Sequence, residues 1–225
     1  MTDTTPFTLR DPKPLGGAVV VWLYLYLMGV IANLAMVALE FEQLGGQSPA
    51  AAFTAGPGAL RIEMMASLTR GAEGLLFLVS GFLFLKWVYR VVANARTLNP
   101  AMRFTPGWAV GWYFVPLACW FKPFEYFKAA WEVSHNPASP AQVYTPSVLR
   151  WWWGLWVASS IAGNIAFRLE MMEPSVGMMQ ASDVFEFLSD ALGVPLTLIL
   201  VRIVRTLSER QHGYVGAAGP APLAG

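Results

Sequence analysis

A run of 25 residues without a charged side chain, from Leu15 to Leu39, most constrains how this chain can fold. About 20 apolar residues, each rising 1.5 Å, suffice for a helix to cross the hydrocarbon core of a bilayer. A cleavable signal peptide has a shorter apolar run, of about 7–15 residues, followed closely by a small-residue cleavage site. This run is too long and lacks such a site. It therefore predicts a retained membrane-spanning helix over residues 15–39.

The composition of the whole chain also indicates a membrane protein. Charged residues make up 13% of the 225 residues, about half of the roughly 25% usual in soluble domains. The net charge of +1 provides no basic field for nucleic acid, so we expect no nucleic-acid partner. One cysteine, Cys119, and two histidines rule out a disulfide framework and leave few metal ligands. We expect no cofactor, no bound metal and no enzymatic activity.

Three further segments have the length and polarity of membrane-spanning helices. They lie at about residues 71–94, 150–167 and 184–203. The predicted fold class is an all-α integral membrane protein, with four transmembrane helices arranged as two hairpins in a single membrane domain over residues 15–212. Both hairpins begin on the same side, so a duplication would be a parallel repeat. Hydrophobic hairpins also resemble one another by composition alone, so the similarity of the two hairpins does not require a duplication.

The two ends of the chain have the composition of flexible tails. Residues 1–14 are polar and contain three prolines, and residues 213–225 are rich in Gly, Ala and Pro. We expect both tails in the cytoplasm.

A proline-broken segment, residues 104–133, separates the two hairpins. Its first 18 residues are uncharged, but prolines and glycines interrupt helical geometry, because proline removes a backbone donor. We predict a re-entrant or interfacial helical element packed against protein. Its distinctive residues are Pro106, Gly107, Trp108, Gly111, Trp112, Pro116 and Pro123. Residues 122–132 have the pattern of an amphipathic helix, which either lies in the cytoplasmic interface or forms a docking surface for a partner.

The distribution of basic residues predicts the orientation. If residues 104–121 do not cross the bilayer, only Arg61, Arg70 and Arg168 of the 15 basic residues lie outside. If the segment crosses, the basic residues divide almost evenly between the two sides. The positive-inside rule therefore favours four spans with both termini cytoplasmic, in a bacterial inner (cytoplasmic) membrane.

Four polar residues within the predicted spans form a candidate intramembrane site. They are Asn33, Asn164, Glu186 and Asp190. Asparagines in apolar helices usually hydrogen-bond across helices, so these two either hold helices together or contact a ligand. Glu186 and Asp190 share one helix face with Asp183, and Glu73 could join them. This face is either a proton or cation site that opens outward or an interfacial surface in water. Asp190 would need a partner on another helix.

Four basic residues form a basic face. Two lie in the last part of the second predicted span, and two follow it. They are Lys86, Arg90, Arg96 and Arg103. Binding of anionic lipid headgroups is the simplest interpretation, and a specific phosphate-bearing ligand is the alternative.

Several motifs resemble a bacterial membrane family catalogued as domain of unknown function 4328. The matching blocks lie in residues 85–96, 103–116, 122–123, 131–132 and 152–156, and the block Pro-Gly-Trp-Ala-Val-Gly-Trp at residues 106–112 is quite specific. The resemblance implies a multi-helix protein of the bacterial inner membrane. It implies no activity.

Two functions remain open from the sequence. The first is a non-catalytic scaffold or accessory subunit that associates with other membrane proteins. It would do so through an aromatic cytoplasmic face, which includes the aromatic residues of the amphipathic stretch 122–132. The alternative is a transporter or channel for a small solute or proton, acting as a homo-oligomer because four spans are few. The expected partners are membrane lipids, together with another membrane protein or a second copy of this chain.

Overall fold

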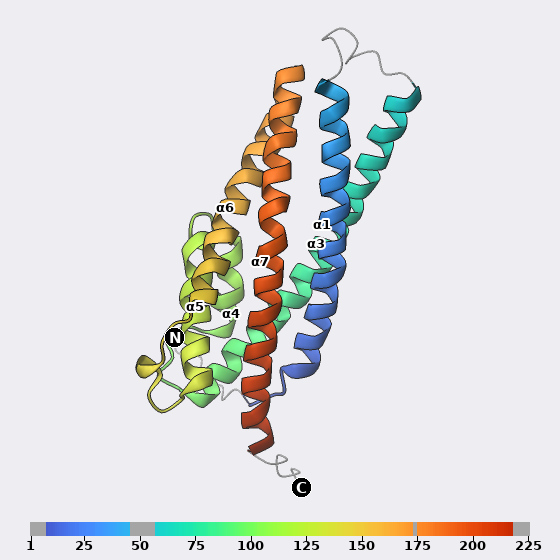
Figure 1. Cartoon of the computed structure of the whole chain (residues 1–225). Helices are drawn as coiled ribbons and strands as arrows, with labels where there is room; N and C mark the ends of the chain where they lie inside the picture. Colours follow the sequence, from blue (N-terminus) through green and yellow to red (C-terminus); the bar gives the residue numbers. More distant parts are fainter. Residues whose placement is uncertain (1–7, 46–56, 173–174, 218–225) are drawn as a thin grey trace. The chain divides into compact units, whose positions relative to one another are not determined.

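The computed structural model describes residues 8–45, 57–172 and 175–217, and all regular elements in these residues are helical (Figure 1). The all-α prediction is confirmed. The α-helices are α1 (Lys13–Gly45), α3 (Pro57–Leu98), α4 (Pro106–Gly111), α5 (Ala118–His135), α6 (Ser147–Glu170) and α7 (Val176–Ala217). Two short 3₁₀ helices, η1 (Trp112–Phe114) and η2 (Pro140–Gln142), complete the described elements.

The four long helices extend beyond the four predicted spans. The excess is largest in α3 and α7, which have 42 residues each, whereas the predictions covered residues 71–94 and 184–203. At 1.5 Å per residue, 42 residues measure about 63 Å, roughly twice the thickness of a hydrocarbon core. The prediction followed the uncharged centres of these helices, but helical structure continues into their charged flanks.

Within the described residues, helices extend into both of the predicted tails. Helix α1 begins at Lys13, whose backbone N–H donates to Asp11 Oδ1 at 2.9 Å, and proline is tolerated in the first turn that follows. Helix α7 continues to Ala217, past the expected start of the second tail at Gly213. Residues 1–7 and 218–225 lie outside the described residues.

Three helices of the described chain are long and apolar enough to cross a membrane. These candidate spans are Lys13–Glu42, Leu60–Leu98 and Gly177–Ala217. Helix α6, which contains the predicted span at residues 150–167, is not among them. Its length is sufficient at 24 residues, but Arg150, Arg168 and Glu170 lie near its ends, and glycines and serines dilute its apolar centre.

The chain divides into two compact units. Unit 1 contains Met1–Val21, Ser80–Trp153 and Ile199–Gly225, and unit 2 contains Trp22–Val79 and Gly154–Leu198. The predicted single membrane domain over residues 15–212 is thus shared between them, because α1, α3, α6 and α7 each contribute residues to both units.

Aromatic side chains form the core of unit 1. Trp87, Tyr126, Phe127 and Trp152 are all at most 2% exposed. The rings of Phe127 and Trp152 meet edge to face with centroids 4.9 Å apart, while Trp87 and Phe127 stack at 6.0 Å. Such pairs add about 0.5–1.5 kcal/mol beyond the burial of their area. The aromatic residues of α5 that were predicted to face an interface are therefore used, in part, to join α3, α5 and α6.

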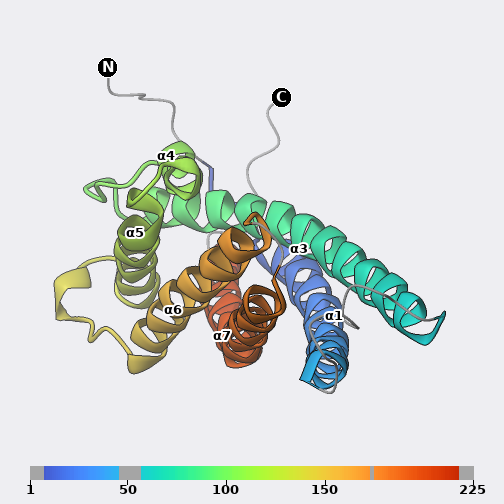
Figure 2. The same cartoon turned by 90° about the horizontal axis from the view of Figure 1, so that it is seen from above.

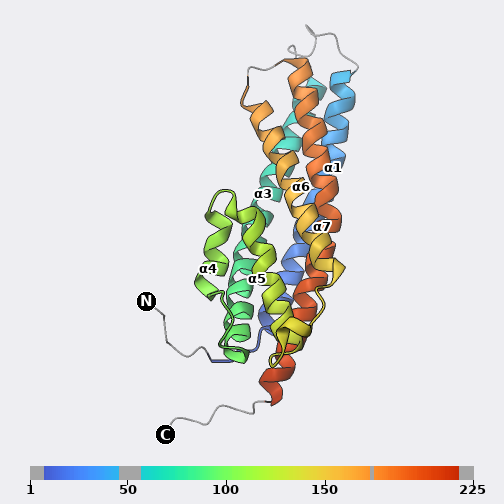
Figure 3. The same cartoon turned by 90° about the vertical axis from the view of Figure 1, so that its left-hand side faces the viewer.

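The proline-broken element folds as a hairpin within unit 1. Helix α4 begins at Pro106, where the missing N–H costs nothing, and α4 and α5 run side by side in opposite directions (Figure 3). The chain reverses at Pro116–Leu117–Ala118, where Ala118 N–H donates to Pro116 O at 2.7 Å. Leu117 has a φ of 63° and a ψ of −42°, close to the strained γ-turn that non-glycine residues rarely adopt. Pro123 lies inside α5.

A fully buried amide connects three helices of unit 1. The Nε2 group of Gln211 donates to Val91 O and to Ser134 Oγ, each at 3.0 Å. Its Oε1 accepts from Asn94 Nδ2 at 2.9 Å, and Asn94 also exchanges two hydrogen bonds with the backbone of Arg10. Because buried polar groups are costly when unpaired, this network specifies how α3, α5 and α7 pack in unit 1.

Small residues let the helices of unit 2 approach closely. The backbone of Gly29 in α1 packs against α3, where an added Cβ would lie 3.5 Å from Glu73 Cα. Ser182 Oγ of α7 donates to Ala166 O of α6 at 3.1 Å, and Ser189 Oγ donates to Ser159 O at 3.2 Å. Figure 2 shows α7 lying between α6 and α1. Close packing of this kind is typical of helix association in membranes.

We predict that Gly16→Ala destabilises unit 1. A Cβ at Gly16 would overlap Ser208 Oγ, which accepts a 2.9 Å hydrogen bond from Trp87 Nε1. Overpacking costs about 1–3 kcal/mol, so the melting temperature in detergent should fall by several degrees. Gly17→Ala is the matched control, because no atom lies within 4 Å of a Cβ there. It should be neutral or stabilising, since alanine favours helix over glycine by about 1 kcal/mol. Equal melting temperatures for the two variants would contradict the close contact.

Candidate functional site

An asparagine of α1 contacts two carboxylates of α7 inside unit 2. The Nδ2 group of Asn33 donates to Glu186 Oε1 and to Asp190 Oδ2, each at 2.9 Å. Glu186 and Asp190 are four residues apart, so both carboxylates project from one face of α7. Asn33 is 2% exposed, and hydrogen bonds to charged acceptors are stronger than neutral ones. The amide thus holds α1 and α7 in one register within this unit.

An arginine of α3 joins the same network. Arg70 Nε donates to Glu186 Oε1 at 3.0 Å, and its terminal nitrogens contact both carboxylate oxygens of Glu40 on α1. The Arg70 side chain is 33% exposed, while those of Glu40 and Glu186 are each 17% exposed. Glu186 Oε1 therefore receives donors from both Asn33 and Arg70. The guanidinium links α1, α3 and α7, and we call Asn33, Glu40, Arg70, Glu186 and Asp190 the charge network.

The charge network contains more negative than positive groups. It contains one guanidinium, which pairs with Glu40 and Glu186, and a third carboxylate, Asp190, which accepts from Asn33. Glu73 of α3 and Asp183 of α7 add two further carboxyl groups, and both interact electrostatically with Glu186 and with Arg70. Outside the candidate spans, burial raises the pKa of Glu170, and the neighbouring Glu186 carboxylate raises it further. This end of unit 2 is strongly acidic.

Three buried oxygen atoms of this region lack a hydrogen-bond donor among the described residues. They are Asn33 Oδ1, Asp183 Oδ2 and Glu186 Oε2. Buried polar atoms are nearly always paired, and oxygen atoms of this kind accept a proton donor or a cation. The part of the chain that the structure describes contains no group of three His, Cys, Asp or Glu residues placed to hold a metal ion. Asp183 and Glu186 are carboxyl groups that can take up a proton, whereas Asn33 Oδ1 can only accept a hydrogen bond.

The structure brings three of the four predicted site residues together. Asn33, Glu186 and Asp190 are in direct contact, and the partner of Asp190 comes from another helix, as its position required. Asn164 does not join them. Its Nδ2 donates to Ser160 O within α6 at 2.8 Å, and the side chain is exposed. An asparagine amide in a helix can satisfy itself locally on the carbonyl four residues earlier, which sequence position alone does not reveal.

Arg70 and Glu40 are members of the network that the sequence did not single out. Both flank the uncharged segments, and Arg70 lies one residue before the predicted span at residues 71–94. For Arg70 a sequence signal was available, because Arg70 and Glu73 are three residues apart and share one face of a helix. The pairing with α1 depends on tertiary packing.

The predicted basic face lies entirely within unit 1. The Nζ of Lys86 is 5.5 Å from the centroid of the Phe82 ring, and Arg90 donates to Asp11 O at 3.3 Å. Arg103 lies over the ring of Phe104, and Arg96 is in the last turn of α3. The residues of the proline-broken element form the α4–α5 hairpin, where the rings of Trp108 and Trp112 pack 4.8 Å apart.

The long apolar helices and the charges paired between them define a multi-pass helical membrane protein. The chain belongs to the family described as Domain of unknown function (DUF4328), whose model matches residues 58–209. The resemblance drawn from the motifs is thereby confirmed. Neither the curated proteins nor the solved structures contain a match to this chain.

We predict that Asn33 and Asp190 are energetically coupled and that Asn33 and Asn164 are not. Asn33→Leu and Asp190→Ala each remove the same hydrogen bond, so the double variant should lose roughly 1 kcal/mol less than the sum of the single variants. Asn33→Leu with Asn164→Leu should be additive, because Asn164 bonds within its own helix. The measurement is thermal unfolding of the three single and two double variants in one detergent. Additivity of the first pair would contradict the observed contact.

Proposed function

We propose that this protein transfers protons across a membrane, with the charge network as its proton-binding site. The carboxylates of Glu186 and Asp190 would take up and release the proton, and Asn33 would hold them in position. Arg70 would keep part of the negative charge balanced while leaving an excess. Ionisable residues in membrane-spanning helices are costly and commonly mark proton or ion pathways.

The observation that carries this proposal is the combination of excess negative charge with unpaired buried oxygens. The network contains one guanidinium and three carboxylates, and Asn33 Oδ1 and Glu186 Oε2 have no donor among the described residues. Protons bound to the carboxylates would reduce the net charge and supply the missing donors. A purely structural ion pair would be expected to match its charges more closely.

We also propose the four-span arrangement, with α6 as the fourth span and both termini on the cytoplasmic side of a bacterial inner membrane. The basic residues support this orientation, because it leaves only Arg61, Arg70 and Arg168 outside. The charge network would then face the outer side. Four spans are few for a transport protein, so we propose that a homo-oligomer is the active form.

Cysteine labelling tests this orientation. Lys128 is exposed on α5, and its replacement by cysteine in a Cys119→Ala background gives one reactive thiol. A membrane-impermeant maleimide should leave residue 128 unlabelled in intact cells and label it after permeabilisation. A cysteine at Ser67, on the exposed surface of α3 in unit 2, is the matched control and should be labelled in intact cells. Labelling of residue 128 in intact cells would overturn the orientation.

Proton transfer is tested with the full chain reconstituted into liposomes that contain a pH-sensitive dye. With a potassium gradient and valinomycin, the wild-type protein should dissipate a pH difference faster than empty liposomes. Asp190→Asn and Glu186→Gln keep the shape of the side chains but cannot carry the proton, so each should reduce the rate at least tenfold.

Glu63→Gln is the matched control for this flux measurement. Glu63 is an exposed carboxylate of α3 outside the charge network, and its loss should leave the rate unchanged. A wild-type rate equal to that of empty liposomes would overturn the proposal, as would undiminished flux in Asp190→Asn.

An accessory role is the second candidate, and one observation favours it. Phe114, Leu117 and Phe121 surround the turn of the α4–α5 hairpin and are each more than half exposed. Apolar residues presented by a strained turn could contact another membrane protein. Purification from the native membrane in mild detergent, followed by mass spectrometry, separates the candidates. A stoichiometric partner that is lost in Phe114→Ser, with normal melting, would favour the accessory role.

A further inference from the structure

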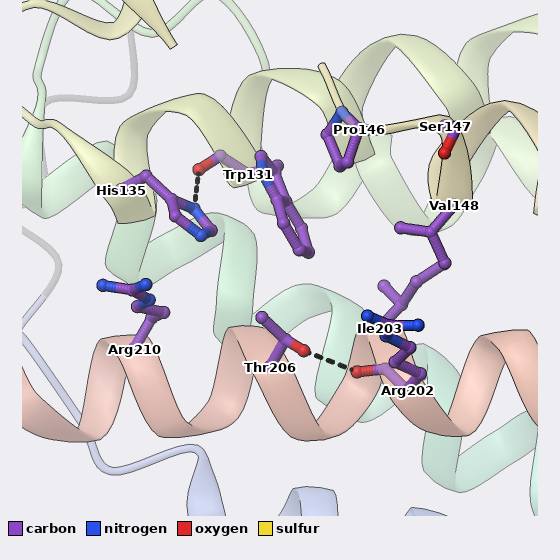
Figure 4. Close-up of a pocket in the computed structure, with 9 residues that line it drawn as sticks. All are labelled: Trp131, His135, Pro146, Ser147, Val148, Arg202, Ile203, Thr206 and Arg210. Carbon is purple, nitrogen blue, oxygen red and sulfur yellow. Dashed lines mark hydrogen bonds between the residues drawn. The ribbon is translucent and has the colours of Figure 1, made fainter. Parts of the chain in front are cut away.

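A cavity of about 360 Å³ lies within unit 1 and shares no residue with the charge network. It is formed where the end of α5, the start of α6 and the second half of α7 meet (Figure 4). Its lining residues are Trp131, His135, Pro146, Ser147, Val148, Arg202, Ile203, Thr206 and Arg210. A volume in this range suits a small ligand or a headgroup rather than a bare ion.

Two arginines give this cavity a positive charge that no carboxylate of the described residues pairs with. Arg202 and Arg210 are eight residues apart on α7, or about 12 Å along the helix. None of the nine lining residues carries a carboxylate, and neither guanidinium forms an ion pair within residues 8–45, 57–172 and 175–217. By contrast, Arg70, Lys122 and Lys128 each have a carboxylate partner.

The start of α6 adds hydrogen-bond donors to the same cavity. Pro146 precedes the helix, and Ser147 and Val148 are its first two residues. The first N–H groups of a helix have no intrahelical acceptor and carry a partial positive charge, which favours anions. The Ser147 hydroxyl is a further donor at this position. This helix end and the two arginines therefore converge on one volume from different elements.

The remaining side chains form a shaped wall. The rings of Trp131 and His135 stack with centroids 4.5 Å apart, and His135 Nδ1–H donates to Trp131 O at 2.8 Å. That hydrogen bond leaves Nε2 of His135 unused, and Arg210 points toward the imidazole ring (Figure 4). The hydroxyl of Thr206 donates to Arg202 O at 2.9 Å, so it offers the cavity only an acceptor.

We propose that this cavity binds a phosphate-bearing ligand, either the headgroup of an anionic phospholipid or a soluble phosphate monoester. Arg202 and Arg210 hold the phosphoryl oxygens, since guanidinium matches their geometry, and the first N–H groups of α6 donate to them. The cavity exceeds the volume of a phosphate group, so it also accommodates a small polar group such as glycerol. The basic face formed by Lys86, Arg90, Arg96 and Arg103 contributes nothing to this cavity.

Binding is measured with the full chain purified in an uncharged detergent. The probes are dioleoylphosphatidylglycerol, dioleoylphosphatidylcholine as the lipid control, and glycerol 1-phosphate as the soluble ester. Native mass spectrometry gives the bound fraction, and thermal unfolding gives the stabilisation that accompanies binding. The double variant Arg202→Gln/Arg210→Gln should weaken binding of the preferred probe at least tenfold. Arg205→Gln removes the same kind of charge from α7 outside the cavity and should change affinity less than twofold.

Ser147→Asp distinguishes ligand binding from a structural role of this region. An acidic residue in the first turn stabilises a helix, so the melting temperature without ligand should stay equal or rise. The same carboxylate repels a phosphate, so binding should be lost. This variant keeps the test decisive even if the double arginine variant unfolds.

The two probes assign the source of the phosphate. Preference for phosphatidylglycerol over both other probes assigns a lipid headgroup, and equal binding of glycerol 1-phosphate assigns a soluble ester. The proposal is overturned if neither anionic probe binds, if Arg205→Gln weakens binding as much as the double variant, or if Ser147→Asp binds like the wild type. None of these outcomes depends on proton flux, so the two proposals fail separately.

Discussion

A guanidinium that must be shared by several carboxylates governs the packing of unit 2. Moving a charge out of water costs several kcal/mol, and the cost is recovered only with good geometry and additional hydrogen bonds. Arg70 supplies this compensation to Glu40 and Glu186, and Asn33 completes it for Glu186 and Asp190. Since these groups come from α1, α3 and α7, their pairing determines the register of the three helices within the unit. The compensation is incomplete, because the network contains one guanidinium and three carboxylates. The proposed proton site follows from this excess of carboxylates.

The buried core of unit 1 is held by neutral interactions. Gln211 satisfies all of its hydrogen-bonding groups against α3 and α5, and the rings of Trp87 and Phe127 stack in the core of the same unit. The contrast has a physical basis, because a satisfied neutral network stabilises one arrangement without leaving charge to be neutralised. Arg202 and Arg210 of unit 1 form no ion pair among the described residues and line its cavity, where the proposed ligand would supply the opposite charge.

Much of the candidate site could be predicted from the sequence, with exceptions that include Asn164 and Arg70. Asn33, Glu186 and Asp190 stood out because polar groups in apolar helices are costly and because the two acids share a face. Asn164 stood out for the same reason, yet it bonds to Ser160 O of its own helix. Arg70 was passed over as a residue of the flank, although α3 begins at Pro57 and places it well inside a helix. Polarity marks a residue as needing a partner, but it does not identify the partner.

The sequence by itself determined that this chain is helical and built around membrane-spanning segments. A backbone in lipid must satisfy its hydrogen bonds internally, and long uncharged runs leave the helix as the solution. Tertiary structure alone decided that Arg70 meets Glu40 and Glu186, that Gln211 meets Asn94, and that Arg202 and Arg210 share a cavity with the start of α6. Each of these contacts joins residues far apart in the chain. Local periodicity fixes which face of a helix a residue occupies, whereas the packing of whole helices decides what that face meets.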